Sequence, residues 1–215
     1  MTRRRISSPR PGYEDNVFIN CPFDDKYKSI FNAVVFAVYD AGFYPRCAFE
    51  LGDATELRLM GIMRIISECK YAIHDISRTQ PDRENRLPRF NMPLELGIFL
   101  GCKAFGGNRH NVKSCLVMDT ELYRYQKFIS DVAGQKVDAH RDDPRTAVSV
   151  VRDWLRTVSS RVNIPGGRVI WKRFNLFLRK LPTACERLNW EPEVLKLKFV
   201  DYRYVIHEFL RDNPL

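Results

Sequence analysis

Two stretches of this sequence decide the fold: YAIHDI at residues 71–76 and RFNMPLELGIFLG at residues 89–101. The first is a short apolar run typical of a buried strand, and the second starts with helix-start residues and continues as an apolar helix. Asn91 suits the N-cap position, and Pro93 suits the first helical turn, where its missing N–H costs nothing. A strand, a loop through Pro88 and then a helix predict one unit of a parallel sheet.

One carboxylate interrupts the apolar helix. Glu95 is the only charged residue between Arg89 and Lys103. Because the helix is apolar nearly all round, we expect it to be buried, and Glu95 with it, one turn inside the N-terminus. Burying an ionised carboxylate there is costly unless it accepts hydrogen bonds or takes part in chemistry. The partial positive charge of the helix N-terminus helps to hold it ionised. Two interpretations stay open: Glu95 caps amides or pairs with an arginine, or it takes part in chemistry.

Strands and helices alternate outward from these stretches as far as residue 159. The expected strands are 17–20, 43–49, 71–76, 114–118 and 136–139, with Pro45 placing the second near an edge. The expected helices are 27–41, 52–69, the helix of Glu95, 122–133 and 144–159. Five such units predict an α/β fold with a doubly wound, five-stranded parallel sheet, flavodoxin-like, in the order 2-1-3-4-5.

The strand pattern stops after the turn at residues 163–167. A helix is expected over 168–188, interrupted at Pro182, and a last helix over 201–211. We therefore divide the chain into a flexible basic arm (1–14), the doubly wound domain (15–162) and a helical C-terminal extension (163–215). The extension is expected to pack on the domain through four apolar residues, namely Trp171, Phe174, Phe177 and Leu178.

Composition excludes several classes of protein. A hydrophobic content of 45% with 12% aromatic residues is ample for a core and excludes global disorder. No apolar run is long enough to span a bilayer, and the basic N-terminus has no apolar signal core. The six cysteines show no CxxC spacing, so neither a disulfide framework nor a metal site is indicated. We expect a cytoplasmic protein without a membrane partner.

The net charge of +9 is concentrated in one segment. Between Arg145 and Lys180 there are nine basic residues and one acidic residue, Asp153, which gives this segment a net charge of +8. One interpretation is a solvated helix face. The other is a docking surface for nucleic acid or for an acidic protein partner, which a segregated basic stripe permits.

Polar residues gather where ligands bind in this class of fold. In a doubly wound sheet, ligands bind beyond the carboxyl ends of the strands, where the strand order reverses. That point lies between the first and third strands, next to residues 20–24, 75–78 and 89–95. The candidate site residues in these loops are Asn20, Pro22, Phe23, Asp75, Ser77, Arg78, Arg89, Asn91 and Glu95.

Several residues of this region also have plain structural interpretations. Asp75 would cap the next turn, and Phe90 would act as a hydrophobic staple before Asn91. Arg46 and Arg58 join Arg78 and Arg89 as possible phosphate ligands, although Arg58 also fits a surface ion pair. His140, after the fifth strand, fits an acid or base as well as an incidental loop residue; a single histidine in a loop is more often incidental, and no catalytic role is assigned to it.

Three motifs carry a family resemblance: FINCPF at residues 18–23, HDIS at 74–77 and NMPLELG at 91–97. Together they resemble the Rossmann-like group that joins nucleoside 2-deoxyribosyltransferases to bacterial TIR and TIR-like nucleotide-binding domains. The resemblance covers roughly residues 15 to 140, the extent of the doubly wound unit. The charged loop 79–88 and the tail after residue 168 depart from both groups.

The resemblance implies an N-glycoside hydrolase or transferase that acts on a nucleotide, NAD-like above all. It implies Glu95 as the catalytic carboxylate and places Asp75 with it, NAD or another nucleotide as substrate or ligand rather than as a separate cofactor, and a homo-oligomer. It also implies a bacterial anti-phage effector. Two alternatives stay open: a non-catalytic nucleotide-sensing module, and a nucleic-acid-associated protein that uses the basic segment 145–180.

Overall fold

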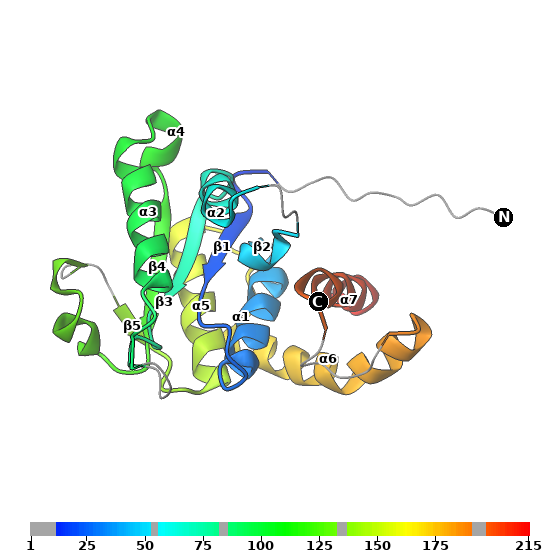
Figure 1. The fold of residues 1–215 in the computed structure, drawn as a ribbon. Helices are drawn as coiled ribbons and strands as arrows, with labels where there is room; N and C mark the ends of the chain where they lie inside the picture. The colour runs from blue at the N-terminus through cyan, green and yellow to red at the C-terminus, as the bar shows by residue number, and fades with distance from the viewer. Residues whose placement is uncertain (1–11, 53–55, 82–85, 133–136, 191–196) are drawn as a thin grey trace.

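A five-stranded parallel sheet forms the centre of the molecule in the computed structural model, which describes residues 12–52, 56–81, 86–132, 137–190 and 197–215. The strand order is β2-β1-β3-β4-β5, and β1 pairs in parallel with both β2 and β3 (Figure 1). The strands are β1 (Asn16–Asn20), β2 (Tyr44–Arg46), β3 (Tyr71–Asp75), β4 (Ser114–Asp119) and β5 (Val137–Ala139). The predicted fold class and strand order are confirmed, with the reversal between β1 and β3.

Helices cover both faces of the sheet. They are α1 (Lys28–Asp40), α2 (Arg58–Ser67), α3 (Asn91–Phe105), α4 (Asn108–Asn111), α5 (Pro144–Ser159), α6 (Gly167–Arg187) and α7 (Phe199–Asp212). Short 3₁₀ turns are η1 (Ala48–Glu50), η2 (Arg124–Lys127) and η3 (Ser130–Val132). Val17 and Ile19 of β1 pack with α1 and α5, whereas Phe18 between them packs with α2 and α3. The period-two alternation of a strand therefore separates the two helix layers.

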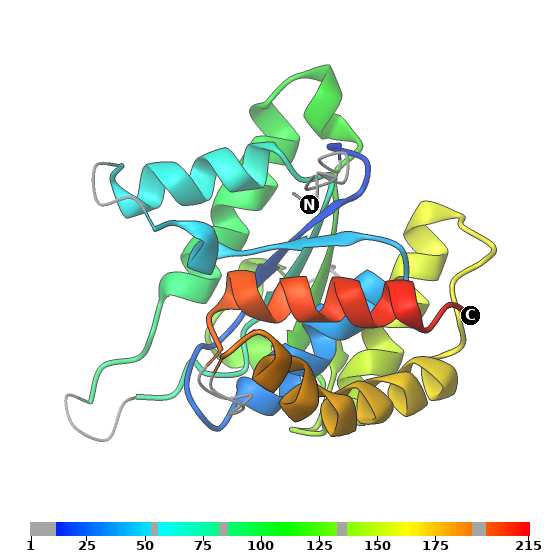
Figure 2. The same ribbon diagram turned by 90° about the vertical axis from the view of Figure 1, so that its right-hand side faces the viewer.

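The C-terminal helices α6 and α7 lie outside α1, so that α1 is enclosed between them and the sheet (Figure 2). Phe36 of α1 is the centre of this contact, because its ring lies 5.4 Å from the rings of Phe174 and Phe177 and 6.1 Å from that of Phe209. Phe174 and Phe177 are buried as predicted, and Trp171 and Leu178 are partly buried against the same core. The extension is therefore helical and continuous with the main core.

Several predicted element boundaries differ from the structure. The second strand is shorter than predicted, since η1 begins at Ala48, and α2 begins at Arg58 rather than near residue 52. Residues 122–132 form two 3₁₀ turns instead of a helix, and residue 133 lies outside the described residues. Pro182 does not interrupt α6, because this helix continues through it to Arg187.

The helix α3 was expected to be buried all round, and this expectation is wrong. Its buried side chains form one stripe, whereas Leu94 is 53% exposed and Phe105 is 90% exposed. Asn91 is the first helical residue rather than the N-cap, and the N-cap residue Phe90 makes no side-chain cap bond. Phe90 is itself exposed, so it does not act as a staple. Pro93 lies in the first turn and Glu95 is buried, as predicted.

No helix within the described residues has the length and hydropathy that a membrane span requires. The predicted basic arm lies mostly outside the described residues, and the division of the chain at residues 14 and 162 stays a prediction.

Candidate functional site

Glu95, in the fifth position of α3, is the most perturbed acidic group of the strand-exit region. It is 7% exposed and makes no hydrogen bond to any residue that the structure describes. Burial raises the pKa of Glu95 to about 7, and the charge of Arg58 at the start of α2 opposes this shift in part. Near neutral pH the carboxyl group is therefore divided between its protonated and ionised forms, as a general acid or base requires.

The start of α3 does not hold Glu95 in its ionised form, contrary to the sequence-based expectation. Four helical residues precede Glu95, and the effect of a helix N-terminus falls off within the first turn. Desolvation is the larger influence, because no described donor compensates for the water that the carboxylate has lost.

Asn20, at the end of β1, fastens the strand to the start of α3. Its side-chain nitrogen donates to the backbone oxygen of Met92 at 2.9 Å and lies 2.9 Å from Nδ1 of His74. Burial and the charge of Lys113 lower the pKa of His74 to about 3, so this ring is neutral. Since Nδ1 accepts from Asn20, the ring proton is on Nε2, which has no partner among the described residues. Asn20 is thus engaged in positioning α3.

Asp75, at the end of β3, is the centre of a fully buried polar cluster. Its Oδ2 accepts a hydrogen bond of 2.5 Å from the hydroxyl of Tyr27 and lies 3.0 Å from Nε2 of His140. The backbone N–H of Asp142 donates to Nδ1 of His140, whereas Nε2 of this ring, although close to Asp75, makes no hydrogen bond to a described residue. Oδ1 of Asp75 accepts from the backbone N–H of Ser77. Asp75 therefore does cap the turn that follows β3, and it also links the loops that precede α1 and α5.

The sheet separates Asp75 from the Asn20 cluster. Along β3, His74 lies against Phe99 of α3, and Asp75 lies on the face of α1 and α5. Cys21, directly after β1, lies near both carboxylates: burial first, and then the charges of Asp75 and Glu95, raise the pKa of its thiol. The charges of both predicted catalytic residues therefore act on the thiol of Cys21. A single cleft shared by Asn20, Asp75 and Glu95 stays a prediction.

The loop after β3 is fixed by bonds within the protein. The hydroxyl of Ser77 is buried without a partner among the described residues. Arg78 is 3.7 Å from carboxylate oxygens of Asp24 and of Asp142, so it joins the exits of β1 and β5. Arg124 donates to the backbone oxygen of Ser77 at 2.9 Å and also pairs with Asp119, which ties this loop to β4.

An exposed aromatic pair lies at the exit of β1. Pro22 is buried, but Phe23 is 37% exposed, and its ring centroid lies 4.1 Å from that of Phe49, which is 43% exposed. Arg89 and Asn91 are exposed at the start of α3, where they are accessible to a ligand. Arg46, by contrast, is held by Glu50 and Glu68, and is therefore not available to bind phosphate.

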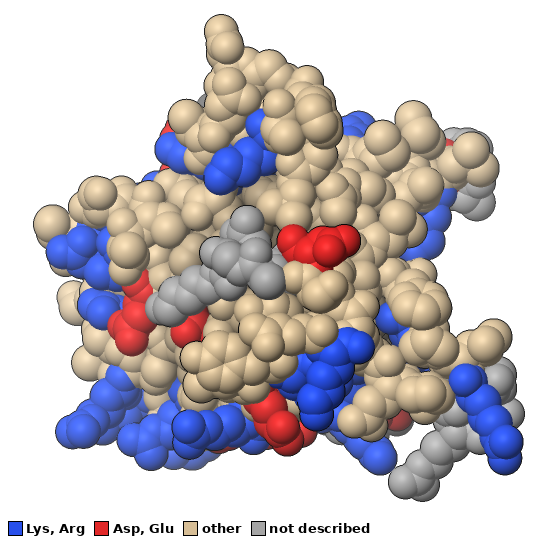
Figure 3. Space-filling view, turned by 90° about the vertical axis from the view of Figure 1, so that its left-hand side faces the viewer, with Lys and Arg blue, Asp and Glu red and all other residues tan. Residues whose placement is uncertain are grey.

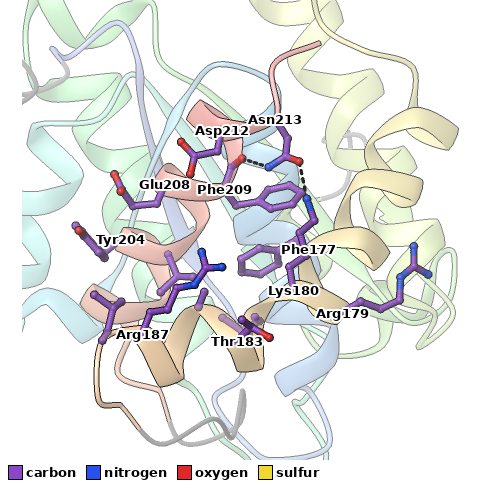
Figure 4. Close-up of a pocket in the computed structure, with 14 residues that line it drawn as sticks. Phe177, Arg179, Lys180, Thr183, Arg187, Tyr204, Glu208, Phe209, Asp212 and Asn213 are labelled. Atoms are coloured by element: carbon purple, nitrogen blue, oxygen red, sulfur yellow. Dashed lines mark hydrogen bonds between the residues drawn. The ribbon is translucent and has the colours of Figure 1, made fainter.

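Two hollows are open on the surface. One, of about 440 Å³, lies at the exits of β4 and β5 and is lined by Thr120, Glu121, Leu122, Ala139, Arg141 and Asp142. The other, of about 500 Å³, lies between α6 and α7 (Figure 4). Phe177 and Phe209 line it, and Lys180 closes one side by donating to Asn213 at 2.8 Å. Neither hollow is lined by Glu95 or Asp75.

Sequence reasoning missed Tyr27, His140 and Phe49. His140 is not incidental, because it lies against Asp75 with its side chain fully buried. His140 directly follows β5 in the loop before α5, and Tyr27 directly precedes α1. Because α1 and α5 share one face of the sheet, this placement was a signal in the sequence. Phe49 could not be recognised from the sequence, since an aromatic residue in or beside a predicted strand is common and is usually part of the core.

No family model, curated protein or solved structure matches this chain. The structure itself shows an α/β protein with a five-stranded parallel sheet in the order 2-1-3-4-5 and C-terminal helices on one side.

Proposed function

We propose that the protein binds a nucleotide at the strand-exit edge between β1 and β3 and cleaves its N-glycosidic bond, with Glu95 as the essential carboxylate. The observation that carries this proposal is the Glu95 carboxyl group. It is buried, it has no hydrogen bond to a described residue, and its pKa is raised to about 7 at the point where the strand order reverses.

Cleavage of the N-glycosidic bond requires few protein groups besides this carboxylate. The bond between the anomeric carbon and the base nitrogen breaks, and its electron pair leaves with the base. An ionised carboxylate beside the sugar stabilises the resulting cationic carbon or attacks it to form an ester. Water then attacks the anomeric carbon. Where the ester has formed, the bond between this carbon and the Glu95 oxygen breaks and the carboxylate is restored; the proton of the water passes to the departed base or to solvent. A cationic ring in the substrate, as in NAD, would itself favour the ionised form of Glu95.

Exposed groups of the strand-exit region suit the remaining parts of a nucleotide. The partly exposed pair Phe23 and Phe49 suits contact with a base, and Arg58, whose charge acts on Glu95, suits a phosphate. Because the oxygens of Asp75 accept from Tyr27 and Ser77, we assign this residue a positioning role rather than a contact with the sugar. NAD as substrate, the homo-oligomer and the role in anti-phage defence rest on the sequence resemblance.

The test is an incubation of the purified chain with NAD and, separately, with nucleosides, followed by chromatography of released nicotinamide or base. We expect release by the native chain and a rate lower by about 100-fold or more for Glu95→Gln, which keeps the shape of the side chain without its charge. Glu186→Gln, an exposed carboxylate at the end of α6, is the matched control and should leave the rate unchanged.

A nucleotide-sensing module without catalysis is the second candidate. Its support is that Asn20 and Asp75 are engaged in internal bonds and that Glu95 lines neither hollow. Calorimetric titration with NAD separates the two: binding without release of nicotinamide favours the sensor, and absence of both binding and release contradicts the whole proposal.

A further inference from the structure

The outer face of α6 carries a row of cations. The buried residues of this helix repeat at helical spacing, at Ile170, Phe174, Phe177, Leu181 and Cys185. A helix has 3.6 residues per turn, so the positions two residues away from this stripe lie on the opposite side. Three of these positions are basic and exposed, and we call them the α6 basic row: Arg168, Lys172 and Arg179.

None of the three side chains of the α6 basic row has an ion-pair partner among the described residues. Other cations of the basic segment 145–180 do form ion pairs within the protein. Arg173, on the same helix, is paired with the buried Asp40 at 2.9 Å. Arg161 is bonded to Asp15 and to the backbone oxygen of Gly42. The segment 145–180 is therefore not one uniform basic stripe. Some of its arginines are bonded within the protein, whereas the side chains of the α6 basic row have no ion-pair partner among the described residues.

The surroundings of the row extend its positive charge. α6 begins against α5: a Cβ on Gly167 would stand 3.0 Å from Oγ of Ser149. Arg145, one turn before Ser149 and also exposed, lies at the same end as Arg168. Figures 1 and 2 both show α6 along the lower edge of the molecule. Figure 3 shows the side opposite to that of Figure 2, where Lys and Arg side chains also gather along the lower edge.

The spacing of the row fits a repeating anion. At 1.5 Å per residue, Arg168 and Arg179 are separated by about 16 Å along the helix axis. One strand of duplex DNA carries a phosphate every 3.4 Å of its axis, so the row faces about five phosphate steps.

The composition of α6 favours nucleic acid over a lipid surface. Val169 is the one exposed large apolar side chain of α6, all of whose residues are described, so the helix offers little that would insert into a bilayer. We propose that the α6 basic row binds the sugar–phosphate backbone of a nucleic acid, without reading its sequence. The row lies on the far side of α6 from the sheet, so the bound nucleic acid leaves the Glu95 site free.

The test is fluorescence anisotropy of the full chain with labelled duplexes of two unrelated sequences, between about 50 and 200 mM salt. We expect both duplexes to bind equally and affinity to fall steeply with salt. The charge-reversed variant Lys172→Glu/Arg179→Glu should bind at least about tenfold more weakly, and the slope of log K against log salt should fall by about 2 units. The matched control, Lys26→Glu/Lys103→Glu, changes two exposed lysines off the row by the same net charge and should keep the slope.

Equal losses in the two double variants would overturn the proposal, because net charge alone would then explain the binding. Tighter binding to anionic lipid vesicles or to an acidic polypeptide than to the duplexes would overturn it as well. Lys172→Gln/Arg179→Gln, which removes charge without reversal, repeats the test if the first variant does not fold. Glu95→Gln should bind the duplexes as the native chain does, so this result stands apart from the fate of the proposed catalysis.

Discussion

Glu95 makes the stability of the protein depend on pH. Its pKa is raised from the ordinary 4.5 to about 7, so between these values the folded chain binds more protons than the unfolded chain. Stability therefore falls as pH rises through this window, by up to about 3 kcal/mol above pH 7. Glu95→Gln removes this penalty. We expect the variant to unfold at higher urea concentration than the native chain at pH 8 and at nearly the same concentration at pH 4, below the pKa of Glu95 in the unfolded chain.

A lower urea midpoint for Glu95→Gln at pH 8 would contradict this expectation, since it would show a carboxylate that anchors the fold. The pH 4 measurement is the internal control, because Glu95 is then largely protonated in both the folded and the unfolded native chain.

The hydroxyl of Tyr27 bonds to a charged acceptor, and this sets the cost of removing it. Tyr27→Phe leaves Oδ2 of the buried Asp75 without its shortest bond, which should cost about 2–3 kcal/mol. Tyr202→Phe is the matched control: its hydroxyl is also buried but donates to the neutral backbone oxygen of Asn32 at 3.2 Å, and its loss should cost about 1 kcal/mol. Urea unfolding of both variants gives the comparison, and an equal or larger loss for Tyr202→Phe would contradict the argument.

At the scale of residues, the sequence located the candidate site but not its bonds. Asn20, Asp75 and Glu95 follow from strand ends and from one charge in an apolar run. Their partners do not, because Met92 contributes a backbone oxygen and His140 lies 65 positions after Asp75. Contacts of this kind depend on which helices share a face, and this is known only once the chain is folded.

The salt bridge between Arg173 and Asp40 joins α6 to α1. Asp40 is buried at the end of α1, and burial raises its pKa while Arg173 opposes the shift. Arg173→Gln leaves this carboxylate without its cation and should destabilise the protein by about 3 kcal/mol. Arg179→Gln, an exposed arginine of the same helix, should change stability by less than about 0.5 kcal/mol. Thermal unfolding of the pair tests the bridge, and similar melting temperatures would show that it contributes nothing.

At the scale of elements, prediction succeeded where local signals agree. The bounds of α5 were predicted as residues 144–159 from its amphipathic pattern, and they are confirmed. In the structure Asp143 caps the helix and Pro144 occupies its first position. Prediction failed at residues 122–132, where apolar spacing resembles a helix but Tyr123 has a left-handed φ of 65°. It also failed at Pro182, since tertiary contacts of α6 outweigh one missing backbone bond.

The whole molecule should unfold as one unit. The sheet domain and the C-terminal helices share a single core around Phe36, so neither part is complete alone. We expect one urea transition, with the same midpoint by tryptophan fluorescence and by far-ultraviolet circular dichroism. The tryptophans Trp154, Trp171 and Trp190 lie on α5, on α6 and after α6.

An earlier fluorescence transition, or a protease-resistant fragment that has lost residues 163–215, would show that the extension separates from the sheet domain. A chain ended at residue 162 is the companion sample, and we expect it to lack a cooperative transition because the outer side of α1 is uncovered.

The enclosure of α1 also determines how this protein can change over generations. An ordinary surface helix keeps one face on which random substitutions are nearly neutral, but 10 of the 13 residues of α1 are buried, between the sheet on one side and α6 and α7 on the other. A new side chain in α1 must therefore suit two layers at once, and drift there requires coordinated changes in both. The outer face of α6 is under no such restraint from packing, so its charges can vary with the partner while α1 stays nearly fixed.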